Sequence, residues 1–219
     1  MSAIFFGSIG SIADTSELQR QSFNQAFEQH GLDWHWTQDE YLSMLEKSGG
    51  THRIKNYAAS VGQSVDAAAI HASKSQIFQE YLRAGEVKPR PGVVETIAQA
   101  KQHGLKLGFV TTTSEENVSS LLSALASDIE RADFDLVVDA SMVERSKPAG
   151  DAYVFALKEL NEKAENCLAI EDNLGGVTAA QTAGISCVGF PGENTTHHDF
   201  SRADLRVDQL SFDELKRFV

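Results

Sequence analysis

The spacing of apolar residues changes partway along the chain and divides it into two regions. Between residues 16 and 87, apolar side chains such as Ile70 and Ile77 recur at helical spacing. After Pro89-Arg90-Pro91, short apolar runs alternate with amphipathic helical segments, which indicates a parallel β-sheet covered by helices. The pattern therefore predicts a helix-only region followed by an α/β region.

Glycines and capping residues set approximate bounds for these elements. In the first region we predict a helix that begins at Asp14 or Thr15 and ends before Gly31, and one that begins at the capping box at Thr37 and ends before Gly49. Two more are predicted over residues 51–60 and 65–84. In the rest we predict strands over residues 3–6, 105–110, 134–138, 167–170 and 185–190 and near Leu205, and helices over residues 91–103, 115–125, 151–161 and 174–183 and from Ser211. The first strand needs partners, so we expect it to join the sheet. The expected fold is α/β, a Rossmann-like parallel-sheet core of residues 1–15 and 88–219 with an all-helical cap inserted as residues 16–87.

The composition narrows the class of protein. The chain has 219 residues, with 19 Lys and Arg against 31 Asp and Glu, and its formal charge of −12 would repel nucleic acid. No apolar run approaches the roughly 18 residues that span a bilayer, and residues 3–12 lack the features of a secretory signal. Cys167 and Cys187 lie in apolar runs and are expected to be buried free thiols, with no Cys/His cluster to suggest zinc. We therefore expect a cytoplasmic protein that binds neither nucleic acid nor membrane.

Polar residues follow three of the predicted strands, at the sheet edge where ligands of α/β proteins bind. Thr111-Thr112-Thr113-Ser114 offers hydroxyls and amides to a phosphate, or caps the next helix. Lys147 offers a positive charge, or is only solvated. Glu171-Asp172 offers oxygen ligands to Mg²⁺, or is solvated or caps a helix. Their shared placement after strands favours a common site.

The combination resembles the motifs of the haloacid dehalogenase (HAD) superfamily. The loop Gly7-Ser8-Ile9-Gly10-Ser11 matches motif I, and Thr111, Lys147 and Glu171-Asp172 match motifs II, III and IV. Within the superfamily the chain is similar to CbbY-type sugar-phosphate phosphatases, near β-phosphoglucomutase and phosphoglycolate phosphatase. The other stretches that carry this likeness are Gly31-Leu32-Asp33-Trp34-His35-Trp36, Gly49-Gly50-Thr51-His52-Arg53-Ile54, Arg90-Pro91-Gly92 and Lys147-Pro148.

The resemblance implies phosphoryl transfer, but two catalytic side chains are missing. In the family, motif I reads Asp-x-Asp-Gly-Thr, where the first aspartate attacks phosphorus and the second moves the proton. These positions hold Gly7 and Ile9 here, while Thr111 and Lys147 are kept as catalytic positions. The family cofactor Mg²⁺ would keep Asp172, and more weakly Glu171 and the Ile9 carbonyl, so we expect its binding to be weak or absent.

The resemblance also implies substrate-binding residues. Glu17, Arg20 and Arg53 match family positions in the cap, and Thr112 would add a contact from the core. The alternative role of the three charged residues is surface salt bridging, which contributes little.

Two cap positions depart from the residues that the family often has there. Gln19 and Thr51 stand where the family often has His and Lys. His197-His198 lies in a polar loop and is expected to be solvated.

Three functions remain open from the sequence. The first is a catalytically inactive HAD-like protein that keeps a pocket for a phosphorylated small molecule or binds a protein partner, because losing two carboxylates reduces the repulsion of phosphate. The alternative is an active Mg²⁺-dependent phosphatase that uses an unusual nucleophile on a small phosphorylated metabolite. Ser8, Ser11 and Asp14 are the candidates, although strand alternation is expected to turn Ser8 away and Asp14 is expected to cap a helix. The third is a purely structural or interaction protein.

Overall fold

Six parallel strands form the centre of the molecule. The computed structural model describes residues 2–45, 49–85 and 87–219. The strands lie in the order β3-β2-β1-β4-β5-β6, so the first strand joins the sheet, as expected, and lies at its centre. Their bounds are β1 Ala3–Phe6, β2 Lys106–Val110, β3 Leu136–Val138, β4 Cys167–Glu171, β5 Ser186–Gly189 and β6 Leu205–Arg206. The predicted Rossmann-like α/β fold is confirmed.

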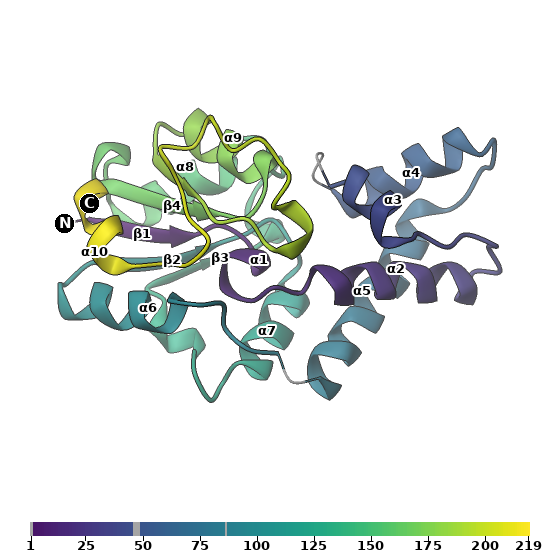
Figure 1. Ribbon diagram of the computed structural model, residues 1–219, viewed down its shortest axis with the longest axis horizontal. Coiled ribbons are helices and arrows are strands. Elements are labelled where there is room, and N and C mark those ends of the chain that lie inside the picture. The colour runs from purple at the N-terminus through teal and green to yellow at the C-terminus, as the bar shows by residue number, and fades with distance from the viewer. Residues whose placement is uncertain (1, 46–48, 86) are drawn as a thin grey trace.

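Helices cover both faces of the sheet (Figure 1). Alternate residues of β1 point to opposite faces, since Ile4 and Phe6 belong to one apolar cluster and Ala3 and Phe5 to the other. The first cluster includes side chains of α6 (Val93–Gln102), α7 (Glu115–Ala124) and α10 (Phe212–Leu215). The second includes side chains of α8 (Asp151–Leu160) and α9 (Leu174–Thr182). All of β1 is therefore buried, as a central parallel strand requires.

The helices between residues 16 and 85 form a separate layer beyond the carboxyl ends of the strands, at the right of Figure 1. They are α2 (Ser16–Gln29), α3 (Gln38–Ser43), α4 (Gly50–Ser60) and α5 (Ala67–Ala84). An aromatic cluster fills the space between them, with the Trp36 ring 4.9 Å from Phe23 and 4.6 Å from Phe27. We refer to this layer as the cap, which remains our interpretation of its role.

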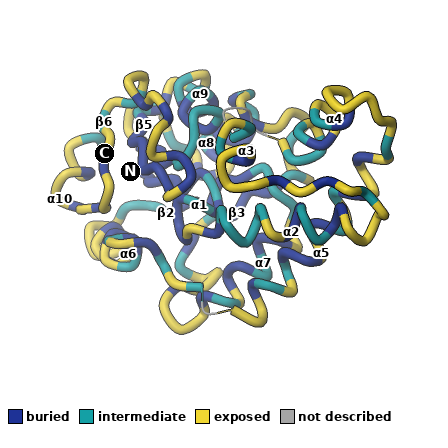
Figure 2. The backbone as a smooth tube through the Cα atoms, turned by 45° about the vertical axis from the view of Figure 1, so that its right-hand side comes forward, coloured by how far each residue is buried: buried dark blue, intermediate teal, exposed yellow. Residues whose placement is uncertain are grey.

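One cap helix connects the two layers. On α5, Ile70 and Ile77 pack in the cap cluster, whereas Phe78 and Leu82 pack in the cluster beneath the sheet. Figure 2 shows buried stretches along α2 and α5, whereas α4 is more exposed. None of the helices in the described residues is long and apolar enough to cross a membrane.

Several element bounds differ from the sequence prediction. The loop after β1 contains a short helix, α1 (Ile9–Ile12), because Ser8 and Ser11 form a reciprocal capping box at its start. Helix α2 consequently begins at Ser16, after an N-cap at Thr15 that makes no side-chain capping bond. The capping box predicted at Thr37 is present, but α3 ends at Ser43. The rest of that predicted helix includes residues 46–48, which lie outside the described residues, as does residue 86 at the predicted cap boundary.

Two further predictions were wrong in detail. Strand β3 begins at Leu136 rather than at residue 134, because the turn at Arg131–Asp133 holds the Phe134 amide to the Arg131 carbonyl. His198 is buried rather than solvated, since its ring stacks on Phe200, a member of the core cluster around α8 and α9.

Candidate functional site

A cavity of about 190 Å³ lies between the cap and the carboxyl ends of the strands. Asp14 and Asp172 line it from the core side, and Tyr41 and Arg53 line it from the cap. Its remaining lining residues are Ile9, Gly10, Thr15, Ser16, Gln19, Leu45, Gly192, Asn194 and Thr195. This is the place where the topology of an open α/β sheet predicts a ligand.

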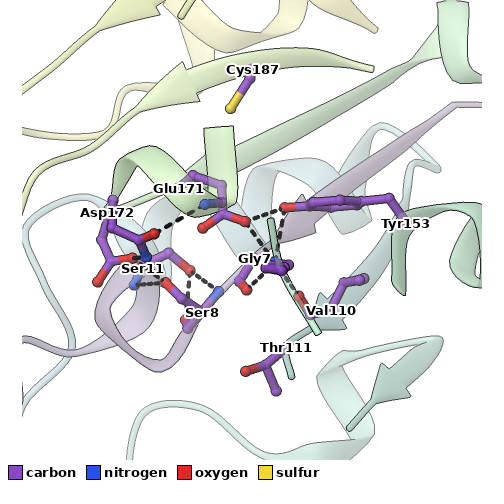
Figure 3. A network of polar contacts seen from close by, with 12 residues as sticks. Gly7, Ser8, Ser11, Val110, Thr111, Tyr153, Glu171, Asp172 and Cys187 are labelled. Carbon is purple, nitrogen blue, oxygen red and sulfur yellow. Dashed lines mark hydrogen bonds and ion pairs between the residues drawn. The ribbon is translucent and has the colours of Figure 1, made fainter. Parts of the chain in front are cut away.

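A buried ion pair lies directly behind motif I. Figure 3 shows Glu171, at the end of β4, turned toward Gly7 and the hydroxyl of Tyr153. Lys147 Nζ donates to Glu171 Oε1 at 2.6 Å and to the carbonyls of Val110 at 2.8 Å and Gly7. The Tyr153 hydroxyl donates to the same Glu171 oxygen at 2.7 Å. The side chains of Lys147 and Glu171 are 6% and 0% exposed, so the pair is closed to solvent.

The Glu171 carboxylate fills the space that a side chain at position 7 would need. A Cβ built on Gly7 would overlap the carboxylate of Glu171 and the hydroxyl of Tyr153. On the other side, a Cβ built on Gly176 would overlap the same carboxylate. Glu171 therefore lies between two glycines. Gly7 not only lacks a nucleophilic side chain but also leaves the space that the Glu171 carboxylate occupies.

The protonation chemistry of this pair is dominated by burial. Burial raises the pKa of the Glu171 carboxyl, an effect opposed by the neighbouring Lys147 ammonium. Burial, with the nearby Glu171 charge, also raises the pKa of Tyr153 well above its usual value, so the phenol stays protonated and donates its hydrogen bond. The arrangement therefore keeps the Glu171 carboxylate between two donors, Lys147 and Tyr153.

The second catalytic position is apolar, and its neighbours are engaged elsewhere. Ile9 is 6% exposed and brings hydrocarbon to the cavity wall. Asp172 accepts hydrogen bonds from Ser8 Oγ at 2.8 Å and from Asn173 Nδ2 at 2.6 Å. Ser8 thus faces Asp172 instead of pointing away, because strand alternation ends at Phe6, where β1 ends.

The donors near motif I bear on the expectation that Mg²⁺ binds weakly. Gly7 has no side chain, Ile9 offers only a carbonyl, and one Glu171 oxygen is taken by Lys147 and Tyr153. In the described part of the chain, no group of three or more His, Cys, Asp or Glu side chains is placed to hold a metal ion. Mg²⁺ is usually bound through one or two carboxylates together with waters and substrate phosphates, and of the expected metal carboxylates Asp172 lines the cavity whereas Glu171 does not.

The predicted phosphate-binding residues of the core lie apart from the cavity. Thr111 is buried, and its Oγ1 accepts from the Thr113 amide at 3.3 Å. Ser114 caps α7, which was the alternative explanation for this stretch. Thr111, Thr112 and Lys147 are not among the residues that line the cavity.

The predicted cap residues divide into two groups. Glu17 and Arg20 pair with each other at 2.6 Å, and Arg20 also donates to the Trp36 carbonyl at 2.7 Å. Neither is among the cavity-lining residues. Arg53 does line the cavity, with its guanidinium 5.3 Å from the centre of the Tyr41 ring.

Lys74 is a charged cap residue that our sequence analysis missed. It is 4% exposed, lies 5.0 Å from the centre of the Phe23 ring and donates to Gln19, which lines the cavity. Burial, with the nearby charge of Arg53, lowers its pKa from 10.5 to about 7. Its spacing from Ile70, four residues earlier on α5, puts it on the apolar face of the helix, and this was the signal in the sequence.

Arg90, where the chain returns from the cap, connects two loops near the cavity. Its guanidinium donates to the carbonyls of Gly10 at 2.7 Å, Phe190 at 2.8 Å and Pro191 at 2.5 Å. Its backbone amide donates to the Ile12 carbonyl at 2.8 Å. One buried side chain thus holds the loop after β1 against the loop after β5.

Comparison with known proteins identifies the family of this chain. The profile of the haloacid dehalogenase-like hydrolases matches residues 10–190, and the chain belongs to this family. Within it the chain is CbbY-like, being 39% identical over 218 residues to protein CbbY of Cereibacter sphaeroides, over 97% of this chain and 93% of that protein.

Two solved structures extend the comparison to the whole fold. The crystal structure of CbbY from Rhodobacter sphaeroides in complex with phosphate matches with a TM-score of 0.87 and 37% identity, covering 98% of this chain and 96% of that one. A mutant of that protein in complex with xylulose-(1,5)bisphosphate matches with the same TM-score of 0.87, identity of 37% and coverage of 98% and 96%. The resemblance predicted from the motifs is confirmed.

Proposed function

We propose that this chain is a catalytically silent member of the haloacid dehalogenase-like hydrolases that binds a small phosphorylated metabolite between core and cap. The observation that carries the proposal is the pairing of Gly7 with Glu171. The carboxylate nearest to the vacant nucleophile position is fully buried and bound to Lys147, and it does not reach the cavity.

The absence of turnover follows from the missing groups. General acid-base catalysis contributes about 10²–10⁴-fold on its own, and Ile9 has no proton to transfer. Positioning and charge neutralisation dominate phosphoryl transfer, and the metal carboxylate expected at position 7 is also absent.

None of the three candidate replacements, Ser8, Ser11 and Asp14, is poised to react. Ser11 Oγ donates to the Ser8 carbonyl at 2.7 Å. Ser8 Oγ accepts from the Ser11 amide at 3.0 Å as the cap of α1. Asp14 accepts from the hydroxyl of Ser16 at 2.6 Å and from the amide of Glu193 at 2.6 Å, so it holds two loops together. These contacts support structural roles for all three residues.

Ligand binding is supported on the cap side of the cavity. Arg53 lines it directly, and Lys74 lies behind Gln19. The solved CbbY structures hold phosphate and xylulose-(1,5)bisphosphate. The ligand class for this chain is therefore a phosphorylated sugar whose anionic group faces the cap, because Lys147 on the core side is already neutralised.

The test combines a turnover assay with a binding assay. We expect no release of inorganic phosphate from a panel of sugar phosphates that includes xylulose-1,5-bisphosphate, with or without Mg²⁺. We expect calorimetry without metal to show binding of at least one of them, weakened at least tenfold by Lys74→Met and unchanged by Lys55→Met on the exposed surface of α4. Release of phosphate that stops on chelation of Mg²⁺ would show that the protein is an active phosphatase.

A further inference from the structure

We infer that Asn194 is a specificity-determining residue of the cavity, whose side-chain amide donates a hydrogen bond to an uncharged hydroxyl or carbonyl oxygen on the carbon skeleton of the ligand. The inference rests on the binding half of the proposed function, since it needs a ligand in the cavity, and it adds which part of that ligand the core side recognises. It does not depend on whether the protein is catalytically silent.

Asn194 carries a buried donor without an acceptor. The residue lines the cavity and is 2% exposed. Its Oδ1 atom accepts a hydrogen bond from Gln38 Nε2 of the cap at 3.2 Å, whereas its Nδ2 atom is buried with no hydrogen-bond partner among the described residues. A primary amide can donate two hydrogen bonds, and an unsatisfied buried donor is unfavourable. An acceptor oxygen on a bound ligand would remove this cost.

The loop around Asn194 is fixed on both sides of this residue. Asn194 lies in a short 3₁₀ turn after β5. The amide of Glu193 donates to Asp14 Oδ2 at 2.6 Å, and Thr195 Oγ1 donates to the Asp172 carbonyl at 2.7 Å. Both neighbours of Asn194 are therefore bonded to the core, and its amide is held in position before a ligand binds.

The charges around the cavity favour an uncharged group beside Asn194. Asp14 and Asp172 line the cavity from the core, as Asn194 does, whereas Arg53 lines it from the cap. Because like charges repel each other, a phosphate group is favoured toward Arg53 and disfavoured beside the two carboxylates. The part of the ligand nearest to Asn194 is therefore expected to be its carbon skeleton with hydroxyl and carbonyl oxygens.

The experiment compares two ligands of equal charge. Xylulose-1,5-bisphosphate carries hydroxyl and carbonyl oxygens between its phosphates, and pentane-1,5-diol bisphosphate carries the same two phosphates on an unsubstituted chain. A site that hydrogen-bonds an oxygen of its ligand rejects an analogue that lacks this oxygen. We expect calorimetry without metal to show that the native protein binds the sugar at least tenfold more tightly than the diol derivative.

Two variants remove the donor in different ways. Asn194→Asp keeps an oxygen that can accept from Gln38 but replaces the donor with a second acceptor, and Asn194→Ala removes the amide altogether. Both should reduce the preference for the sugar at least fivefold. The charge that Asn194→Asp adds acts on both ligands alike, so it cancels in the comparison, and if one variant does not fold the other measures the same quantity.

Two control variants separate ligand recognition from a merely structural role. Gln38→Met removes the contact to Asn194 Oδ1 but leaves the donor, so it should weaken both ligands alike and keep the preference within twofold of the native value. Asn166→Asp makes the same amide-to-acid change at an exposed position just before β4, at the opposite end of the sheet from the cavity, and should behave like the native protein.

The outcomes distinguish the inference from the proposed function. If neither bisphosphate binds to the native protein, the proposed function fails and the inference fails with it. If a bisphosphate binds, the inference alone is overturned when the native protein shows no preference for the sugar, when the preference survives in the Asn194 variants, or when Gln38→Met loses it to the same extent.

Discussion

Lys147 Nζ and Glu171 Oε1 lie 2.6 Å apart in a pair that is shielded from water on all sides. Removing one member of a buried pair leaves the other charge uncompensated, at a cost of about 3–5 kcal/mol. We therefore expect Lys147→Met to lower the free energy of unfolding by about that amount. The double variant Lys147→Met, Glu171→Gln should recover most of the loss, because neither charge remains. Urea unfolding measures a double-mutant cycle of the native protein, Lys147→Met, Glu171→Gln and the double variant. Strictly additive losses would contradict an energetic coupling between the two side chains.

Tyr153 supports the same carboxylate through one hydrogen bond, at 2.7 Å. Tyr153→Phe removes a donor to a buried charged group, so we expect a loss of about 1.5–3 kcal/mol in the free energy of unfolding. Tyr81→Phe is the matched control, since its hydroxyl bonds Gln25 at a partly buried position. The control should cost less, and equal losses in the two variants would mean that Glu171 does not depend on Tyr153.

Lys74 makes stability depend on pH. Burial lowers its pKa to about 7 from 10.5, so the unfolded chain binds a proton that the folded protein lacks between these values. The stability of the native protein should therefore rise with pH across this range. His71, with a pKa lowered by burial to about 4, does not titrate there.

The variant that tests this pH dependence is Lys74→Met. It should gain stability relative to the native protein, most at pH 6 and least at pH 10. Urea unfolding at pH 6, 8 and 10 measures the difference, with Lys55→Met as a surface control that should show a small offset independent of pH. A constant difference for Lys74→Met would mean that Lys74 keeps its charge when buried.

Restoring the two aspartates of motif I should restore some phosphatase activity. We expect Mg²⁺-dependent hydrolysis of a sugar phosphate in the Gly7→Asp, Ile9→Asp double variant and none in either single variant, because groups that act as one unit are strongly non-additive. The rate should be low, since a side chain at position 7 must first displace the Glu171 carboxylate.

Magnesium titration tests our description of the metal donors independently of turnover. The native protein should bind Mg²⁺ weakly, because Asp172 is the one carboxylate of the expected metal set that lines the cavity. Calorimetry should show tighter binding in the double variant. Tight stoichiometric binding by the native protein would contradict our description of the donors.

The layers of the fold could be predicted from the sequence because local patterns determine them. The apolar run at residues 3–6 forms the central strand, and the capping box at Thr37 begins a helix as expected. The short helix α1 was missed because it depends on Ser8 and Ser11 capping each other, which competes with the loop expected after a strand.

The sequence predicted which residues lie at the site but not which contacts they make. Motif matches located Gly7, Lys147 and Glu171, which are distant in sequence and adjacent in space. The sequence could not show that Glu171 turns into the space beside Gly7, because that depends on the distance between neighbouring strands and on Gly176 in the following helix. Lys74 was missed because the apolar spacing of α5 predicts a helix but does not show that a lysine on its apolar face is buried.

Arg90 links the segment returning from the cap to the loops around the cavity. The Arg90 amide is hydrogen-bonded to the Ile12 carbonyl, and its guanidinium is hydrogen-bonded to the Gly10 and Pro191 carbonyls. The segment returning from the cap and two loops near the cavity are therefore linked. We expect a rotation of the cap that pulls on this segment to move those loops with it. A ligand that fixes the position of the cap should then also fix the width of the cavity.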